Sequence, residues 1–79
     1  HGEDVKLSPA ARRKFPFSIE VKNQEKLNIW ESFEQAKKNA KHHTPLLIYK
    51  RNRSEMMCTL RFEDFLKLVV AIEGKAEIS

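Results

Sequence analysis

Glu20 and Lys22 are the residues whose types and spacing best predict chemistry in this chain. They stand two positions apart, and the apolar residues Phe17, Ile19 and Val21 alternate with polar ones around them. In an extended strand this alternation places Glu20 and Lys22 on one face and the apolar side chains on the other. A carboxylate that holds a metal-bound water beside a lysine is a common arrangement for hydrolysing a phosphodiester. The pair therefore predicts nuclease chemistry.

The spacing alone is not specific, because a chain with 33% charged residues repeats it by chance. Residues 73–75 have the same Glu-x-Lys pattern, and residues 4–6 come close to it. The context differs, since Gly74 weakens a strand and indicates the end of a helix, whereas Glu20 follows a proline and two apolar strand residues. A solvated strand face is the alternative interpretation of Glu20 and Lys22.

Length and charge limit the architecture and the partners. With 79 residues, of which 41% are hydrophobic, the chain predicts one globular domain over residues 1–79. Its 15 basic and 11 acidic residues give a net charge of +4, which favours an anionic partner. Because a domain of this size has little core, we expect it to act as a homodimer.

A single cysteine, Cys58, excludes an internal disulfide, and no Cys/His set has zinc-site spacing. The longest apolar runs are far shorter than the roughly 20 residues that span a bilayer, and no signal-peptide pattern is present. We therefore expect no membrane partner and an intracellular, cytoplasmic location. Because the chain starts at His1 without a methionine, we also expect it to be N-terminally truncated or trimmed.

The strongest secondary-structure signal is a helix at about 28–41. Asn28 can cap it, with Glu31 three residues later, and lysines and Pro45 mark its end. Its expected core stripe consists of Ile29, Trp30, Phe33, Ala36 and Ala40. The apolar run 46–49 predicts a buried strand, so that strand 17–22, the helix and this strand form a βαβ unit with parallel strands.

The rest of the chain predicts smaller elements. Residues 8–12 indicate a short helical turn, and residues 51–54 a polar turn. Residues 56–60 then form an antiparallel strand, in which Cys58 is a small core residue, and residues 61–73 an amphipathic helix. The apolar stripe expected on this helix consists of Phe62, Phe65, Leu66, Val69 and Ile72. The predicted fold class is α/β, with helices packed on a small mixed sheet.

This order of parts resembles the core of the PD-(D/E)XK nuclease superfamily, a restriction-endonuclease-like fold. More narrowly, several segments look like small phage-type nucleases of the Holliday junction resolvase kind, and together they span almost the whole chain. These segments are residues 2–4, 15–23, 27–30, 34–36, 45–47 and 51–54. The chain departs from the family at its start, where members usually have an N-terminal helix and a first strand, and this puts the activity of the chain as given in doubt.

By position, the resemblance implies that Asp4, Glu20 and Lys22 are the motif's two acids and its lysine, and that Gln35 matches a glutamine on the following helix. Glu3 competes with Asp4 for its role. Mg²⁺ prefers hard oxygen ligands, so Asp4, Glu20 and the carbonyl of Val21 could hold Mg²⁺ or Mn²⁺. Lys22 would orient or deprotonate the attacking water. Gln35 could hold that water or a phosphate oxygen, or simply be a polar position beside the helix core.

Basic residues cluster at 12–14, at the lysines of 37–41 and at 50–53. Such residues can bind DNA phosphates without sequence preference, although a solvated charged surface is an equal alternative for any one cluster. The best candidates for DNA contacts are Arg12, Arg13, Lys50, Arg51 and Arg53. Three functions remain open: a Mg²⁺-dependent endonuclease acting on branched DNA, a non-catalytic basic DNA-binding module, and a small interaction domain.

Overall fold

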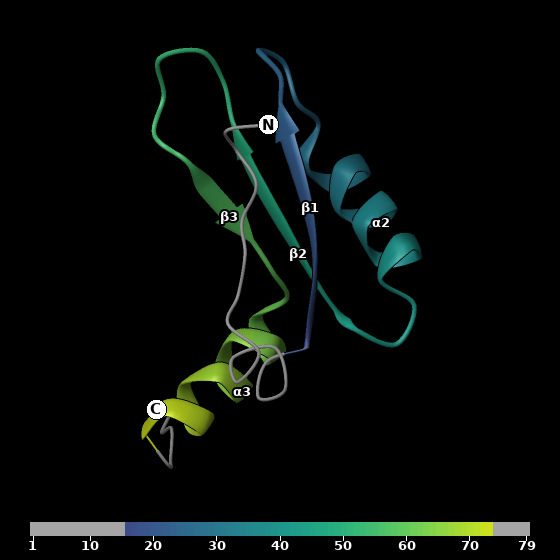
Figure 1. Ribbon diagram of the computed structural model, residues 1–79, viewed down its shortest axis with the longest axis vertical. Coiled ribbons are helices and arrows are strands. Elements are labelled where there is room, and N and C mark those ends of the chain that lie inside the picture. The colour runs from purple at the N-terminus through teal and green to yellow at the C-terminus, as the bar shows by residue number, and fades with distance from the viewer. Residues whose placement is uncertain (1–15, 74–79) are drawn as a thin grey trace.

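The computed structural model describes residues 16–73 (Figure 1). Its elements are β1 (Phe17–Asn23), α2 (Ile29–Ala40), β2 (Thr44–Lys50), β3 (Met57–Thr59) and α3 (Phe62–Glu73). This confirms the order of elements expected after residue 16. The helical turn expected at residues 8–12 lies outside the described residues.

The three strands form one sheet in the order β1-β2-β3. β1 runs parallel to β2, with Glu20 opposite Leu47 and Lys22 opposite Tyr49, and β3 pairs antiparallel with β2, with Cys58 opposite Ile48. Residues that face each other across the ladder share a face of the sheet. The sheet is therefore small and mixed and contains the expected βαβ unit.

α2 covers the face of the sheet that carries Leu47. The side-chain oxygen of Asn28 caps it by accepting a hydrogen bond from the N–H of Glu31 (3.1 Å). Ala36 and Ala40 are buried, and Leu47 is 0% exposed. The small alanine side chains let the helix approach the sheet closely, so the buried Ala36, Ala40 and Leu47 lie between α2 and β2. Ile48, which is also buried, is on the opposite face of β2.

Trp30 and Cys58, which were both expected in the core, are at the surface. Trp30 is 85% exposed, because at about 100° per residue it lies about 120° around the helix from Ala36. Ala36 and Ala40 are buried, and Trp30 falls outside the stripe that they form with the half-buried Ile29. Cys58 is also exposed, since it sits on the short edge strand β3. The sequence-based core assignments of both residues were wrong.

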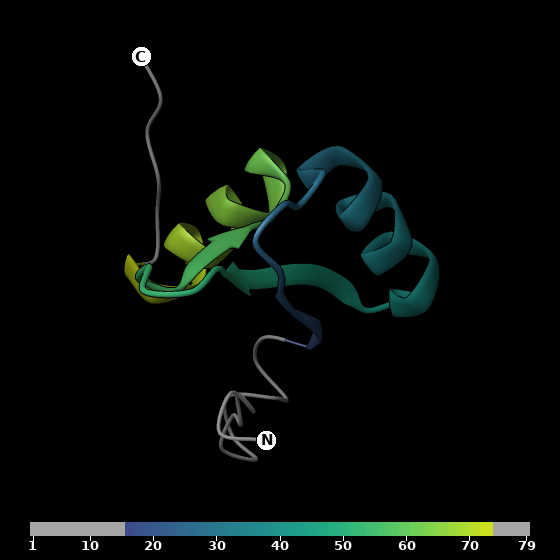
Figure 2. The ribbon, with the colours of Figure 1, turned by 90° about the horizontal axis from the view of Figure 1, so that it is seen from above.

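α3 lies at the end of the sheet where β1 begins, well apart from α2 (Figures 1 and 2). It packs only lightly on the other described elements. As a result Phe62, Phe65 and Ile72 are exposed, contrary to the expected stripe, while Leu66 and Val69 are half-buried. Within residues 16–73, no helix is long and apolar enough to cross a membrane.

Candidate active site

Glu20 and Lys22 lie side by side on the α2 face of β1. The alternation of the strand places both residues on the face that carries Leu47 and Tyr49 of β2. Two positions along a strand separate Glu20 from Lys22 by roughly 7 Å. Both are partly buried. The strand expected for Glu20 and Lys22 is confirmed. Glu73, by contrast, lies in α3, and the rest of its triplet, residues 74–75, lies outside the described residues.

The Glu20 carboxylate is held by α2. The side-chain amide of Asn39 donates a hydrogen bond to Glu20 Oε1 (3.0 Å), and Asn39 Oδ1 accepts a long, weak one from Gln35 Nε2 (3.5 Å). The structure thus connects Gln35 with Glu20, but through Asn39. The sequence reasoning missed Asn39, although it follows Gln35 at the i+4 spacing that places two residues on one side of a helix.

The carbonyl of Val21 faces away from β2. Two hydrogen bonds to β2 flank this part of β1: the N–H of Thr44 donates to the carbonyl of Pro16 (3.0 Å), and the N–H of Gln24 donates to the carbonyl of Lys50 (3.2 Å). In a parallel ladder a residue directs both backbone groups to the same neighbour. Even-numbered residues of β1 therefore bond to β2, and Val21 directs its N–H and C=O to the edge where no described strand pairs.

These oxygens suit a hard divalent ion. Within the described residues nothing donates to Glu20 Oε2, so this oxygen and the Val21 carbonyl are two ligands of the type that Mg²⁺ prefers. No group of three or more His, Cys, Asp or Glu side chains gathers within residues 16–73. The other predicted ligand, Asp4, and its competitor Glu3 lie outside that range, so the described residues contribute two oxygens of the right chemical type.

The expected basic turn follows β2. Ser54 N–H donates to Arg51 O (3.1 Å), and Ser54 Oγ accepts from Arg51 N–H (2.9 Å), which closes a tight turn. Because β1 and β2 are parallel and Lys22 is level with Tyr49, the turn lies at the Lys22 end of the sheet. Lys50 lies there as well, as the last residue of β2, whereas Arg12 and Arg13 lie outside the described residues.

Arg53 occupies a backbone position that favours glycine. Its φ is 61°, in the left-handed region, where a side chain costs about 1 kcal/mol relative to glycine. The turn therefore presents an arginine where a glycine would be easier to accommodate. Such backbone positions are enriched at functional sites.

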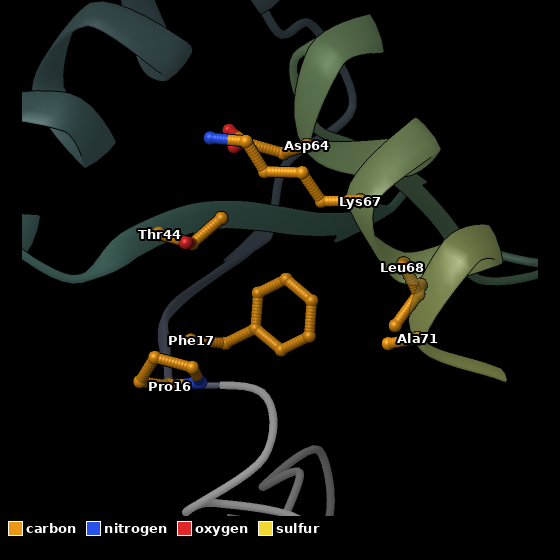
Figure 3. A pocket seen from close by; sticks show the side chains of 7 residues that line it. All are labelled: Pro16, Phe17, Thr44, Asp64, Lys67, Leu68 and Ala71. Carbon is orange, nitrogen blue, oxygen red and sulfur yellow. The ribbon is translucent and has the colours of Figure 1, made fainter. Parts of the chain in front are cut away.

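A separate cavity of about 170 Å³ lies where α3 meets the sheet (Figure 3). The ring of Phe17 lies between the start of β1 and Leu68 and Ala71 of α3. Asp64, which is 7% exposed, pairs with Arg61 (Nε–Oδ2 2.9 Å). Ligand sites are usually larger, roughly 300–1,000 Å³. We interpret this cavity as the seam that anchors α3, at the opposite end of the strands from Lys22.

Comparisons with protein families, with curated proteins and with solved structures find no match to this chain.

Proposed function

We propose that this protein is a metal-dependent endonuclease that hydrolyses DNA phosphodiesters, with branched, Holliday-junction-like DNA as the preferred substrate. The proposal rests mainly on the environment of the Glu20 carboxylate. One of its oxygens is fixed by Asn39, the other is open, Lys22 lies on the same face, and the Val21 carbonyl points to the neighbouring edge. A solvated strand face would not need the hydrogen bond from Asn39, which restricts the orientation of the carboxylate.

The chain's residues take the following roles in the proposal. Glu20, the Val21 carbonyl and Asp4 hold the ion, and Asn39 fixes the orientation of the Glu20 carboxylate. Lys22 makes no ion pair within residues 16–73, so its ammonium can orient the attacking water or stabilise charge on the phosphate. Bound Mg²⁺ or Mn²⁺ supplies Lewis-acid polarisation of the phosphate and a more acidic water.

The test is cleavage of a four-way DNA junction and of linear duplex in Mg²⁺, Mn²⁺, Ca²⁺ or EDTA. We expect cleavage with Mg²⁺ or Mn²⁺, none with Ca²⁺ or EDTA, and faster cleavage of the junction. Salt-sensitive binding without cleavage in any metal would instead establish the rival, a non-catalytic basic DNA-binding module. If the protein neither cleaves nor binds DNA, the remaining alternative is a small interaction domain.

Asn39→Ala should raise the Mg²⁺ concentration for half-maximal cleavage about tenfold, because residues that orient a metal ligand typically change affinity by 10–100-fold. Gln35→Ala should have a smaller effect, since its hydrogen bond to Asn39 is long. Lys38→Ala, an exposed neighbour on α2, is the control. A larger loss of maximal rate in Gln35→Ala than in Asn39→Ala would show that Gln35 acts on the water or phosphate directly.

We also propose that the active unit is a homodimer, since paired cuts in a junction need two symmetric sites. α3 supports this, because Phe62, Phe65, Val70 and Ile72 are exposed on a helix of 12 residues, a length that is marginal in isolation. Val70→Asp should convert a dimer to monomer in sedimentation at micromolar concentration, without loss of helical circular dichroism. A monomeric wild type that makes paired incisions would contradict the proposal.

An intracellular, cytoplasmic location is part of the same proposal. The exposed thiol of Cys58 suits a reducing compartment, where free cysteines persist.

A further inference from the structure

A larger cavity lies at the end of the sheet where β1 and β2 finish. Its volume is about 360 Å³, within the usual range for ligand sites. The β1–α2 connection and the β2–β3 turn both lie at this end (Figure 1). Asn52 N–H donates to Glu25 Oε1 (3.0 Å), which ties the two connections together. The two connections that border the cavity are therefore held together by a hydrogen bond within the fold.

The apolar part of the cavity suits a flat ring. Leu27 and Ile29 line it from the α2 side, and Tyr49 and Met57 from the sheet. The Tyr49 hydroxyl shares a hydrogen bond with Thr59 Oγ1 (3.1 Å), which fixes the ring. Aromatic rings and thioethers both make favourable contacts with planar π systems.

The polar part suits an uncharged ligand with donors and acceptors. Two cations, Lys50 and Arg51, are balanced by two carboxylates, Glu25 and Glu55. Inside the cavity a phosphate would meet both signs of charge, whereas the edge of a nucleobase carries donors and acceptors that these groups and the Gln24 amide can match. Arg51 is exposed, so its guanidinium can still contact a phosphate outside the cavity.

The cavity also lies in line with the candidate active site. Gln24 continues the strand alternation two residues beyond Lys22, on the same face, roughly 13 Å from Glu20. At about 3.4 Å per nucleotide, or more when unstacked, a DNA strand covers this in about two to four nucleotides.

The geometry points to a nucleobase site: this cavity takes an unpaired base of the same DNA strand whose phosphate lies at Glu20 and Lys22. The inference rests on the proposed nuclease function and deepens it, because a base that is already unpaired can enter such a site at little unstacking cost. It adds a preference for DNA with an unpaired base close to the cut, which the positions of Glu20 and Lys22 do not provide.

The experiment uses the whole chain in Ca²⁺ and two duplexes that carry the fluorescent base 2-aminopurine, one with that base unpaired and one with it paired. The wild type should change the fluorescence of the unpaired base only. Met57→Ala should weaken binding of the unpaired-base duplex about tenfold and leave the paired duplex unchanged. Met56→Ala is the matched control, since Met56 is 47% exposed against 51% for Met57 but does not line the cavity.

The outcomes separate this inference from the nuclease proposal. Equal affinity of Met57→Ala and wild type for the unpaired-base duplex, or no response of the unpaired base, would overturn the base site, while metal-dependent cleavage would still stand. Competition by free dAMP as strong as by the oligonucleotide would also overturn it, because the site would then serve a mononucleotide. A wild type that binds neither duplex would remove both proposals.

Discussion

Glu20→Gln is expected to lower metal-dependent DNA cleavage by about 10³-fold or more, whereas Glu73→Gln leaves it unchanged. The reason is that the substitution removes the negative charge that holds the ion but keeps the fold. Gln presents an amide oxygen where Glu20 Oε1 accepts from Asn39, so the hydrogen bond to α2 persists. Single-turnover cleavage of a labelled junction measures the rate, and thermal unfolding checks stability.

Lys22→Ala is expected to lower the same rate by about 10²–10⁴-fold, the range for a group that assists proton transfer or water positioning. Lys26→Ala, in the exposed connection after β1, removes the same charge nearby and should retain activity. Full activity in both Glu20→Gln and Lys22→Ala would refute the assignment of the site to β1. Because Asp4 belongs to the proposed site, the whole chain must be used.

The double substitution Arg51→Ala and Arg53→Gly should weaken binding of all DNA sequences by about tenfold or more. If each guanidinium contacts one phosphate, the slope of log K against log salt should fall by about 1.8 for duplex DNA. Glycine at position 53 suits the φ of 61°, so the turn itself should not be destabilised. Fluorescence anisotropy across a salt series measures both quantities.

Lys38→Ala with Lys41→Gly is the matched control. It also removes two positive charges, and it also places a glycine at a positive φ, since Lys41 has a φ of 55°. The two double variants therefore have the same net charge and differ in where the charge was lost. Equal effects of both variants would indicate that net charge alone drives binding. A loss confined to one DNA sequence would indicate base readout instead of phosphate contact.

The sequence by itself determined the elements and their order. Alternation of apolar residues predicted β1, the Asn28 cap and the helical period predicted α2, and the apolar run of β2 predicted its burial. These signals are local, because side-chain periodicity and helix capping depend on residues a few positions apart. The parallel pairing of β1 with β2 followed from the helix between them.

The tertiary structure alone decided how those elements meet. The rotation of α2 on the sheet brought Asn39 to Glu20 and left Trp30 in solvent. The docking of α3 at the end of the sheet, and not across its face, exposed Phe62 and Phe65. A helical stripe specifies which residues are apolar but not which of them a neighbouring layer covers, because that depends on contacts between segments distant in the sequence.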